Sequence, residues 1–165
     1  MPSLNKLAVV SIGNPLRGDD GIGHWIGEQV EQWGIPGVTV FSFHQLQTDL
    51  LEQFLEFNAI LIVDAAINME GVEFRKENTA GGNQLHPRAD HSLQGSNGAG
   101  STHHLNISLL TSLAEKLFHR HLNLTVCKIG VSGFEMGAPF SAMALENGEK
   151  SLNLIRDWIS RESAN

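Results

Sequence analysis

The chain has 165 residues, a length typical of a single domain. Hydrophobic residues make up 41% of it and charged residues 18%, which is the balance of a globular protein. Lys and Arg number 11 against 18 Asp and Glu, so the formal net charge is −7. This acidic balance argues against binding to nucleic acid or to an anionic membrane, because both depend on clustered basic residues.

Cysteine usage and the N-terminus indicate the cytoplasm. The only cysteine, Cys127, cannot form an internal disulfide and suits a reducing compartment. It lies in an apolar run, so we expect a packed core thiol and not a nucleophile. The segment before the first predicted strand is too short for the hydrophobic region of a signal peptide. No apolar run approaches the roughly 20 residues of a membrane span.

Continuous apolar or β-branched runs predict buried strands. They are Leu7–Ile12, Val38–Phe43, residues 59–63 with Asp64 at their end, and Leu124–Val131. Residues 72–76 predict a short edge strand. Residues 77–100 have no periodicity and are rich in Gly and Asn, so we expect a long flexible loop there.

Helical spacing of apolar residues appears between these runs. It predicts a helix that begins near Ile22 and ends at Gly34, and a short helix over residues 50–55 with Thr48 or Asp49 as its cap.

Two further helices follow in the second half of the chain. Leucines at every fourth position from 105 to 117 mark one, which starts at Ser101 or Thr102. Ser141 is expected to cap the final helix, whose interior Gly148 favours a kink. The alternation of strands and helices predicts one α/β domain over residues 1–165, with a twisted, mainly parallel sheet and helices on both faces.

Ligands of such folds bind outside the carboxyl ends of the strands. The residues expected there are Asp20 after the first strand, Asp64 after the third, and His103 or His104 at the start of a helix. Carboxylate oxygens and imidazole nitrogens suit borderline divalent ions such as nickel or zinc. Three protein ligands would leave a coordination position open for water or substrate.

Each of these residues also has a local interpretation. Asp20 could cap the following helix, Asp64 could bind a neighbouring loop, and His103 could cap or pack. The glycines of residues 13–23 could belong to a nucleotide-binding loop, but their spacing is not G-x-G-x-x-G and two adjacent carboxylates would repel a pyrophosphate.

Four motifs carry a resemblance to a known family. They are residues 13–23 (GNPLRGDDGIG), 62–66 (IVDAA), 101–103 (STH), and 133–137 (GFEMG) with Phe140 and Ser141 following. In this order and spacing they resemble the hydrogenase maturation proteases, the endopeptidases that process the large subunit of nickel–iron hydrogenases. The resemblance covers nearly the whole chain and implies a hydrogenase maturation protease-like fold, of the phosphorylase/hydrolase-like type.

The resemblance also implies the site. Carried over by position, the metal-binding and catalytic residues are Asp20, Asp64 and His103; many family members have Glu where Asp20 stands. Alignment to Ser-Thr-His favours His103 over His104, and neighbouring residues of a helix point about 100° apart. Asp19 is either a cap or a support for the ligands.

The implied activity is removal of the C-terminal extension of a hydrogenase large-subunit precursor after nickel insertion. The nickel presented by the substrate is the recognition signal, and zinc or another divalent ion could occupy the site in isolation. No Gly-x-Ser-x-Gly or His-Glu-x-x-His motif is present, so we expect a water nucleophile, with Asp19 or Asp20 as general base.

Other hypotheses remain open at this point. A non-catalytic, metal-sensing maturation chaperone would use the same three residues, and a nucleotide-binding module would use the glycine-rich loop. A processing enzyme for another metalloprotein differs only in its substrate. No heptad or long apolar edge is visible in the sequence, so a monomer is expected.

Overall fold

The computed structural model describes residues 3–77 and 102–165, and for residues 102–106 it describes the backbone alone. The strands are β1 (Leu7–Ile12), β2 (Val38–Phe43), β3 (Ala59–Ile67), β4 (Val72–Glu77) and β5 (Leu124–Val131). The α-helices are α1 (Ile22–Gln32), α2 (Leu51–Phe54), α3 (Thr102–Phe118) and α4 (Ala142–Ala164). Two 3-10 turns, η1 (Gly18–Gly21) and η2 (Thr48–Leu50), precede α1 and α2.

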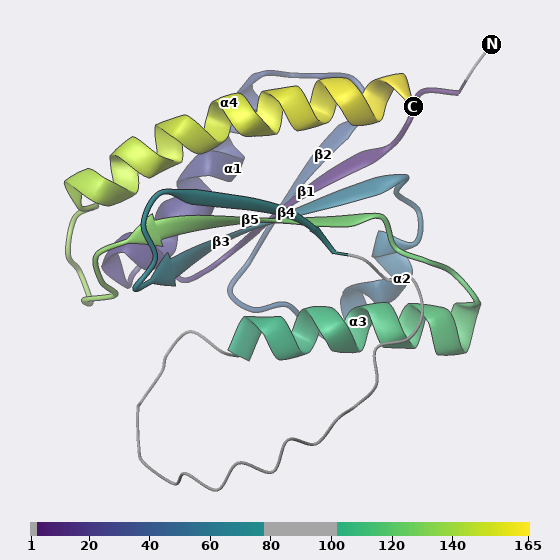
Figure 1. The fold of residues 1–165 in the computed structure, drawn as a ribbon, viewed down its shortest axis with the longest axis horizontal. Helices are drawn as coiled ribbons and strands as arrows, with labels where there is room; N and C mark the ends of the chain where they lie inside the picture. Colours follow the sequence, from purple (N-terminus) through teal and green to yellow (C-terminus); the bar gives the residue numbers. More distant parts are fainter. Residues whose placement is uncertain (1–2, 78–101) are drawn as a thin grey trace, which may run out of the picture.

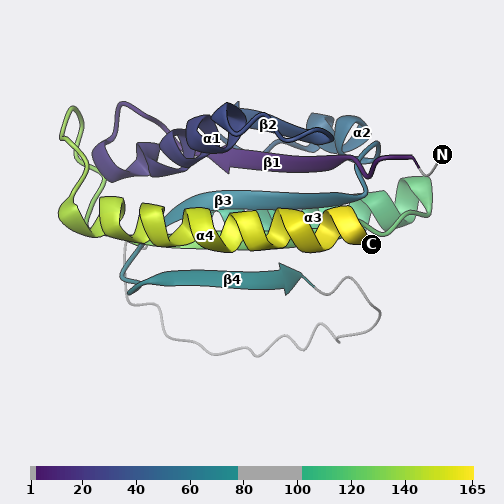
Figure 2. The same ribbon diagram turned by 90° about the horizontal axis from the view of Figure 1, so that it is seen from above.

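The strands form one sheet in the order β2-β1-β3-β5-β4, with β2 at one margin and β4 at the other (Figure 2). The four strands β1, β2, β3 and β5 are parallel, and β4 pairs antiparallel with β5. The mainly parallel sheet and the predicted edge strand are therefore confirmed. The predicted loop over residues 77–100 lies outside the described residues, except that Glu77 is the last residue of β4.

Helices cover both faces of the sheet, as predicted (Figure 1). Alternate residues of each central strand enter different cores, because successive side chains of a strand point to opposite faces. Val9 of β1 packs in the core under α1 and α4, whereas Val10 packs in the core under α2 and α3.

The strands β1, β2 and β5 have the predicted bounds, but β3 does not end at Asp64. It continues to Ile67 because β5 offers it a partner residue for residue, through Asp64↔Lys128 as far as Ile67↔Val131. Asp64 therefore lies inside β3, but next to the end of the neighbouring strand β1, since β1 stops pairing with β3 at Ser11↔Val63.

The predicted helices are present, with one correction. Thr48 and Asp49 do not cap the short helix: they lie inside η2, and the residue before α2 is Leu50, without a side-chain cap. Among residues 107–118 of α3, the buried apolar positions are Ile107, Leu110 and Ala114. The leucines spaced four apart do not form this buried face. A spacing of four residues drifts about 40° around a helix at each step, so Leu109 is already 47% exposed.

Two glycines bring α1 close to its neighbours. A Cβ on Gly148 of α4 would lie 3.1 Å from the Trp25 ring, so this glycine lets α4 pack on α1 within one continuous helix. A Cβ on Gly23 would lie 2.9 Å from the Ile12 carbonyl oxygen and 3.1 Å from that of Val63. Gly23 thus sets the first turn of α1 directly against the carboxyl ends of β1 and β3.

Among the described residues, none of the helices combines the length and the apolar character that crossing a membrane requires.

Gly23→Ala should destabilise the fold by about 1–3 kcal/mol, because the new methyl group meets backbone oxygens that cannot rotate away. Urea unfolding followed by circular dichroism measures the change. Gly133→Ala is the matched control, since a Cβ there meets no atom within 4 Å. It should leave the free energy of unfolding unchanged or raise it by about 0.4–1 kcal/mol. Equal effects of the two substitutions would contradict the steric role of Gly23.

Candidate functional site

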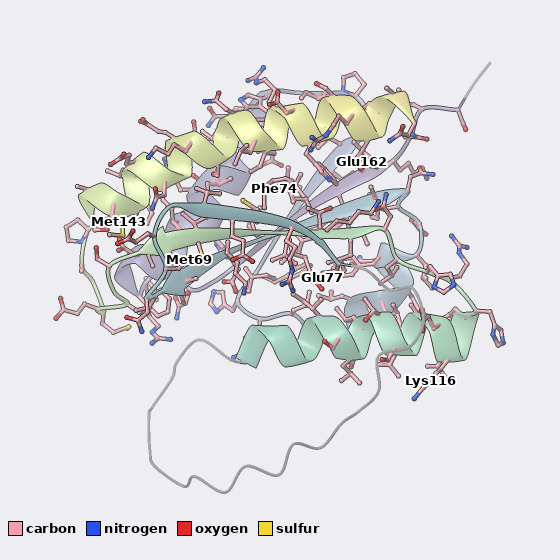
Figure 3. The ribbon with its side chains drawn as sticks, viewed as in Figure 1. Met69, Phe74, Glu77, Lys116, Met143 and Glu162 are labelled. Atoms are coloured by element: carbon pink, nitrogen blue, oxygen red, sulfur yellow. The ribbon has the colours of Figure 1, made fainter. Side chains whose placement is uncertain are left out.

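The candidate site lies at the carboxyl edge of the parallel strands. Figure 3 marks this end of the molecule by Met143, in the first turn of α4, and by Met69, between β3 and β4; Glu162 marks the opposite end. The loop after β1, the loop after β5 and the first turn of α4 all meet here. The helix α3 also begins at this edge, because it leads back to the start of β5 at the other edge (Figure 1).

Asp19 is the most completely bonded side chain of the site. It is 2% exposed. Its Oδ1 accepts a hydrogen bond from the Ser141 backbone N–H at 2.7 Å. Its Oδ2 accepts from the Ser141 hydroxyl at 2.7 Å, from the Ser132 N–H at 3.0 Å and, at 3.4 Å, from the Gly133 N–H. Both oxygens are therefore occupied by groups that hold three separate segments together.

Ser141 connects this carboxylate to α4. Its hydroxyl accepts a hydrogen bond from the Ala144 N–H at 3.1 Å while donating to Asp19, so it is the N-cap that the sequence predicts. A carboxylate at the N-terminus of α4 also interacts favourably with the positive end of the helix dipole. Asp19 is thus a structural anchor, since both of its oxygens accept hydrogen bonds from protein groups.

Asp20, the neighbouring residue, has a different environment. It is 8% exposed, and its Oδ2 accepts one hydrogen bond, from the Asn14 N–H at 2.9 Å. It does not cap α1, whose N-cap position is Gly21 without a side-chain hydrogen bond. Within the described part of the chain no donor reaches Oδ1 of Asp20, which leaves that oxygen available to a ligand.

Asp64 lies at the same edge of the sheet, in β3, the strand that neighbours β1. Its strand neighbour Val63 pairs with Ser11, and η1 contacts β3. Asp20 Oδ1 is 3.4 Å from the point where Gly13, the residue after β1, would carry a Cβ. Both acidic residues therefore lie at the carboxyl edge of the sheet, near the end of β1. Asp64 itself is 9% exposed.

The third predicted residue can be placed only by its backbone. His103 and His104 lie in the first turn of α3, at the correct edge, but their side chains lie outside the described residues. Asp64 continues the alternation of Ile60 and Ile62, which face the core under α2 and α3. The side of the sheet that carries Asp64 is thus the side that α3 covers.

The donor set fits a borderline divalent ion. Oxygen from Asp20 and Asp64, with imidazole nitrogen from the start of α3, is a combination that suits nickel or zinc. Of this set, Asp20 has one oxygen that no protein donor reaches within the described residues. Among those residues alone no group of three metal-binding side chains is found, and the histidine side chains are not among them.

The glycine-rich loop is unsuited to phosphate. A phosphate loop offers free backbone N–H groups. Here the Gly13 N–H donates to the Phe43 carbonyl, the Asn14 N–H to Asp20, and the Asp19 N–H to the Gly133 carbonyl. The loop thus uses these donors internally, which argues against the nucleotide-binding hypothesis.

Cys127 is excluded as a nucleophile. It is fully buried in β5, and burial raises the pKa of its thiol to about 12. The thiol therefore stays protonated at neutral pH, and the predicted core role is confirmed.

A hollow adjoins the site on the β5 side. It has a volume of about 400 Å³ and is lined by Asp19, residues 132–133, Glu135, Ala138 with Pro139, and Ser141. Its wall combines apolar side chains with backbone of the loop that Asp19 holds in place. An extended peptide segment could lie in such a groove.

Replacing Asp19 by Asn should destabilise the protein by at least about 3 kcal/mol, because an amide NH₂ would face donors and the charge-assisted bonds would be lost. Thermal or urea unfolding measures this. Asp49→Asn is the control, since Asp49 is exposed and should tolerate the same change within about 0.5 kcal/mol. If both variants unfolded together with the wild type, Asp19 would not be the anchor described.

Solved structures share this architecture. The maturation protease HybD from Thermococcus kodakarensis superposes with a TM-score of 0.63 at 17% identity, over 93% of this chain and 98% of that one. The HybD endopeptidase of E. coli gives 0.67 at 16%, over 94% and 93%. The maturation protease HycI from T. kodakarensis KOD1 gives 0.65 at 18%, over 99% and 96%.

No family model and no curated protein matches the sequence. The likeness therefore rests on three-dimensional structure, where the paired regions span nearly all of each chain. It agrees with the motif order found in the sequence. The chain has the fold of the nickel–iron hydrogenase maturation proteases.

Proposed function

We propose that the chain is an endopeptidase that removes the C-terminal extension of a nickel–iron hydrogenase large-subunit precursor after nickel insertion, using the bound nickel as its recognition signal. The observation that carries this proposal is the position of two buried carboxylates, Asp20 in η1 and Asp64 in β3, at the carboxyl edge of the sheet where η1 contacts β3, in a fold shared with maturation proteases. The reducing compartment that suits a lone Cys127 supports a cytoplasmic location.

The register of α3 supports His103 as the third ligand. Position 103 lies seven residues, about two turns, before Leu110, which is fully buried against the sheet. Position 104 stands in the same relation to Thr111, which is partly exposed. Of the two positions, 103 therefore belongs to the side of the helix that faces the sheet and Asp64.

The nickel belongs to the substrate in this proposal. Asp20, Asp64 and His103 would contact the nickel that the precursor carries, and its remaining coordination positions would stay with the precursor's own thiolates. A precursor without nickel would lack this contact, so only the metallated form would dock with its tail across the site. When bound there, a divalent ion can polarise a carbonyl or lower the pKa of water.

The residues of the chain restrict how the peptide bond is cut. Cys127 is buried and protonated, so we expect water to attack the peptide bond directly, without a covalent intermediate on this thiol. Both oxygens of Asp19 accept hydrogen bonds from the protein, which makes Asp19 a poorer general base than Asp20. Asp20 remains the carboxylate of the first motif that can position or deprotonate a water. The groove beside Asp19 would hold the extended tail.

The central test is mass spectrometry of a large-subunit precursor incubated with the protein, in nickel-loaded and nickel-free forms. We expect release of a C-terminal fragment from the loaded precursor alone, because docking requires the substrate's nickel. Cleavage of both forms would agree with peptidase activity but overturn the proposed recognition of nickel. Binding of the loaded precursor without cleavage would overturn the peptidase proposal and favour a maturation chaperone.

Substitution of the carboxylates tests the site. Asp20→Asn and Asp64→Asn should each lower the cleavage rate about 100-fold or more, equivalent to roughly 2.7 kcal/mol of transition-state stabilisation. Asp49→Asn, which changes an exposed carboxylate, should cleave at the wild-type rate. Circular dichroism establishes that each variant is folded. Full activity of either site variant would show that the substituted residue takes no part in cleavage.

A further inference from the structure

Two imidazoles lie together at the end of β2, next to the candidate site but not part of it. His24 is in the first turns of α1 and His44 directly follows β2. Their ring centroids are 6.2 Å apart, with an angle of 44° between the ring planes. His24 is half-buried and His44 is exposed.

The tautomer of His24 is set by the backbone. Its Nε2 lies 3.2 Å from the Phe43 carbonyl oxygen, and a carbonyl only accepts, so Nε2 carries the proton. In the neutral ring the lone pair is therefore on Nδ1. No hydrogen bond to Nδ1 occurs within the residues that the structure describes. Histidines that bind metal ions usually donate their other N–H to a carbonyl in this way, which fixes the ring and raises its basicity.

The separation of the rings suits a shared ion. A cation held by two imidazole nitrogens at about 2.0–2.1 Å keeps the ring centroids roughly 5–6.5 Å apart. The exposed His44 can rotate its side chain, whereas His24 is held by Phe43. His44 also lines a hollow of about 400 Å³ with Gln45 and Gln47, which leaves room for water to complete the coordination.

We propose that His24 and His44 form a second site, for a borderline divalent cation such as zinc or nickel. Imidazole nitrogen is the ligand that these ions share. The net charge of −7 favours the approach of a cation. Two protein ligands and water make this an open site that exchanges its ion, in contrast to a closed structural centre.

The second site is separate from the carboxylate site but linked to it through the backbone. The Phe43 carbonyl accepts from both His24 and the Gly13 N–H. Gly13 in turn lies against Asp20, since a Cβ on Gly13 would be 2.0 Å from the Asp20 carbonyl oxygen. The two sites therefore lie along one sheet edge, with the histidine pair on the β2 side and Asp64 on the β3 side of β1.

Zinc titration of the metal-free protein, followed by long-range ¹H–¹⁵N spectra of the histidine rings, tests the proposal. The resonances of His24 and His44, assigned from His24→Gln and His44→Gln, should shift together with one zinc dependence. In His44→Gln, the zinc concentration needed to shift the His24 resonances should rise roughly 10–100-fold, a loss of affinity at least as large as that caused by removing a hydrogen-bond partner of a metal ligand. If His24 responded to zinc equally in both proteins, or did not respond, the pair would not be a site.

Control variants separate this site from the proposed peptidase. His121→Gln removes an exposed histidine whose Nδ1 is 2.9 Å from Glu115 Oε1, and should leave the His24 response unchanged. Asp64→Asn should also leave it unchanged, and a coupled loss would place the zinc at the carboxylate site and overturn the proposal. The zinc response does not depend on cleavage, so an inactive protein that still coordinates zinc through His24 and His44 would refute the peptidase and retain this site.

Discussion

The arrangement of the sheet's carboxyl edge depends on the buried carboxylate of Asp19. A charge removed from water is costly unless hydrogen bonds replace its hydration, and Asp19 receives donors from Ser132, Gly133 and Ser141. These donors belong to the loop after β5 and to the start of α4, whereas Asp19 belongs to the loop after β1. One side chain thus fixes the positions of three segments whose ends form the candidate site and the groove beside it. The N-cap of α4 is formed by the same contact, so the helix and the site edge are stabilised together.

The glycines of residues 13–23 serve this close assembly. Gly13 has a φ of 142°, and the absence of a side chain leaves room for the Asp20 backbone. Gly18 has a φ of 55°, and a Cβ on it would lie only 2.9 Å from the Glu135 carbonyl oxygen. Gly23 admits α1 to the ends of β1 and β3. A nucleotide-binding loop needs glycine so that phosphate can approach its backbone, and here other parts of the same chain occupy that space. The same residue type at a similar place in the fold therefore serves a different chemistry.

The sequence predicts elements well where one physical signal is sufficient. The strands β1, β2 and β5 were predicted to the residue, because buried strands are unbroken apolar runs bounded by turns. The predicted end of β3 is wrong because Asp64 resembles a strand terminator locally, whereas its pairing with Lys128 depends on a strand 64 positions further along the chain. The predicted cap of α2 is wrong for a similar reason, since a local cap signal does not decide where the helix begins. The bond between Asp19 and Ser141 leaves no local pattern at all, although each residue was noticed alone. The proximity of His24 to His44 likewise leaves no local pattern, because it depends on how α1 packs beside the end of β2.

Asp19 and Asp20 are adjacent and chemically identical, so their environments must separate their roles. Both oxygens of Asp19 accept hydrogen bonds from backbone N–H groups or the Ser141 hydroxyl, which commits this carboxylate to holding the loops together. Asp20 accepts a single bond from the Asn14 N–H, which orients the carboxylate and leaves its other oxygen without a donor among the described residues. A residue that supports an active centre needs the first environment, and a residue that contacts a substrate ion needs the second. The division supports Asp20 as the functional member of the pair for a reason independent of the motif, because it follows from the partners of each oxygen.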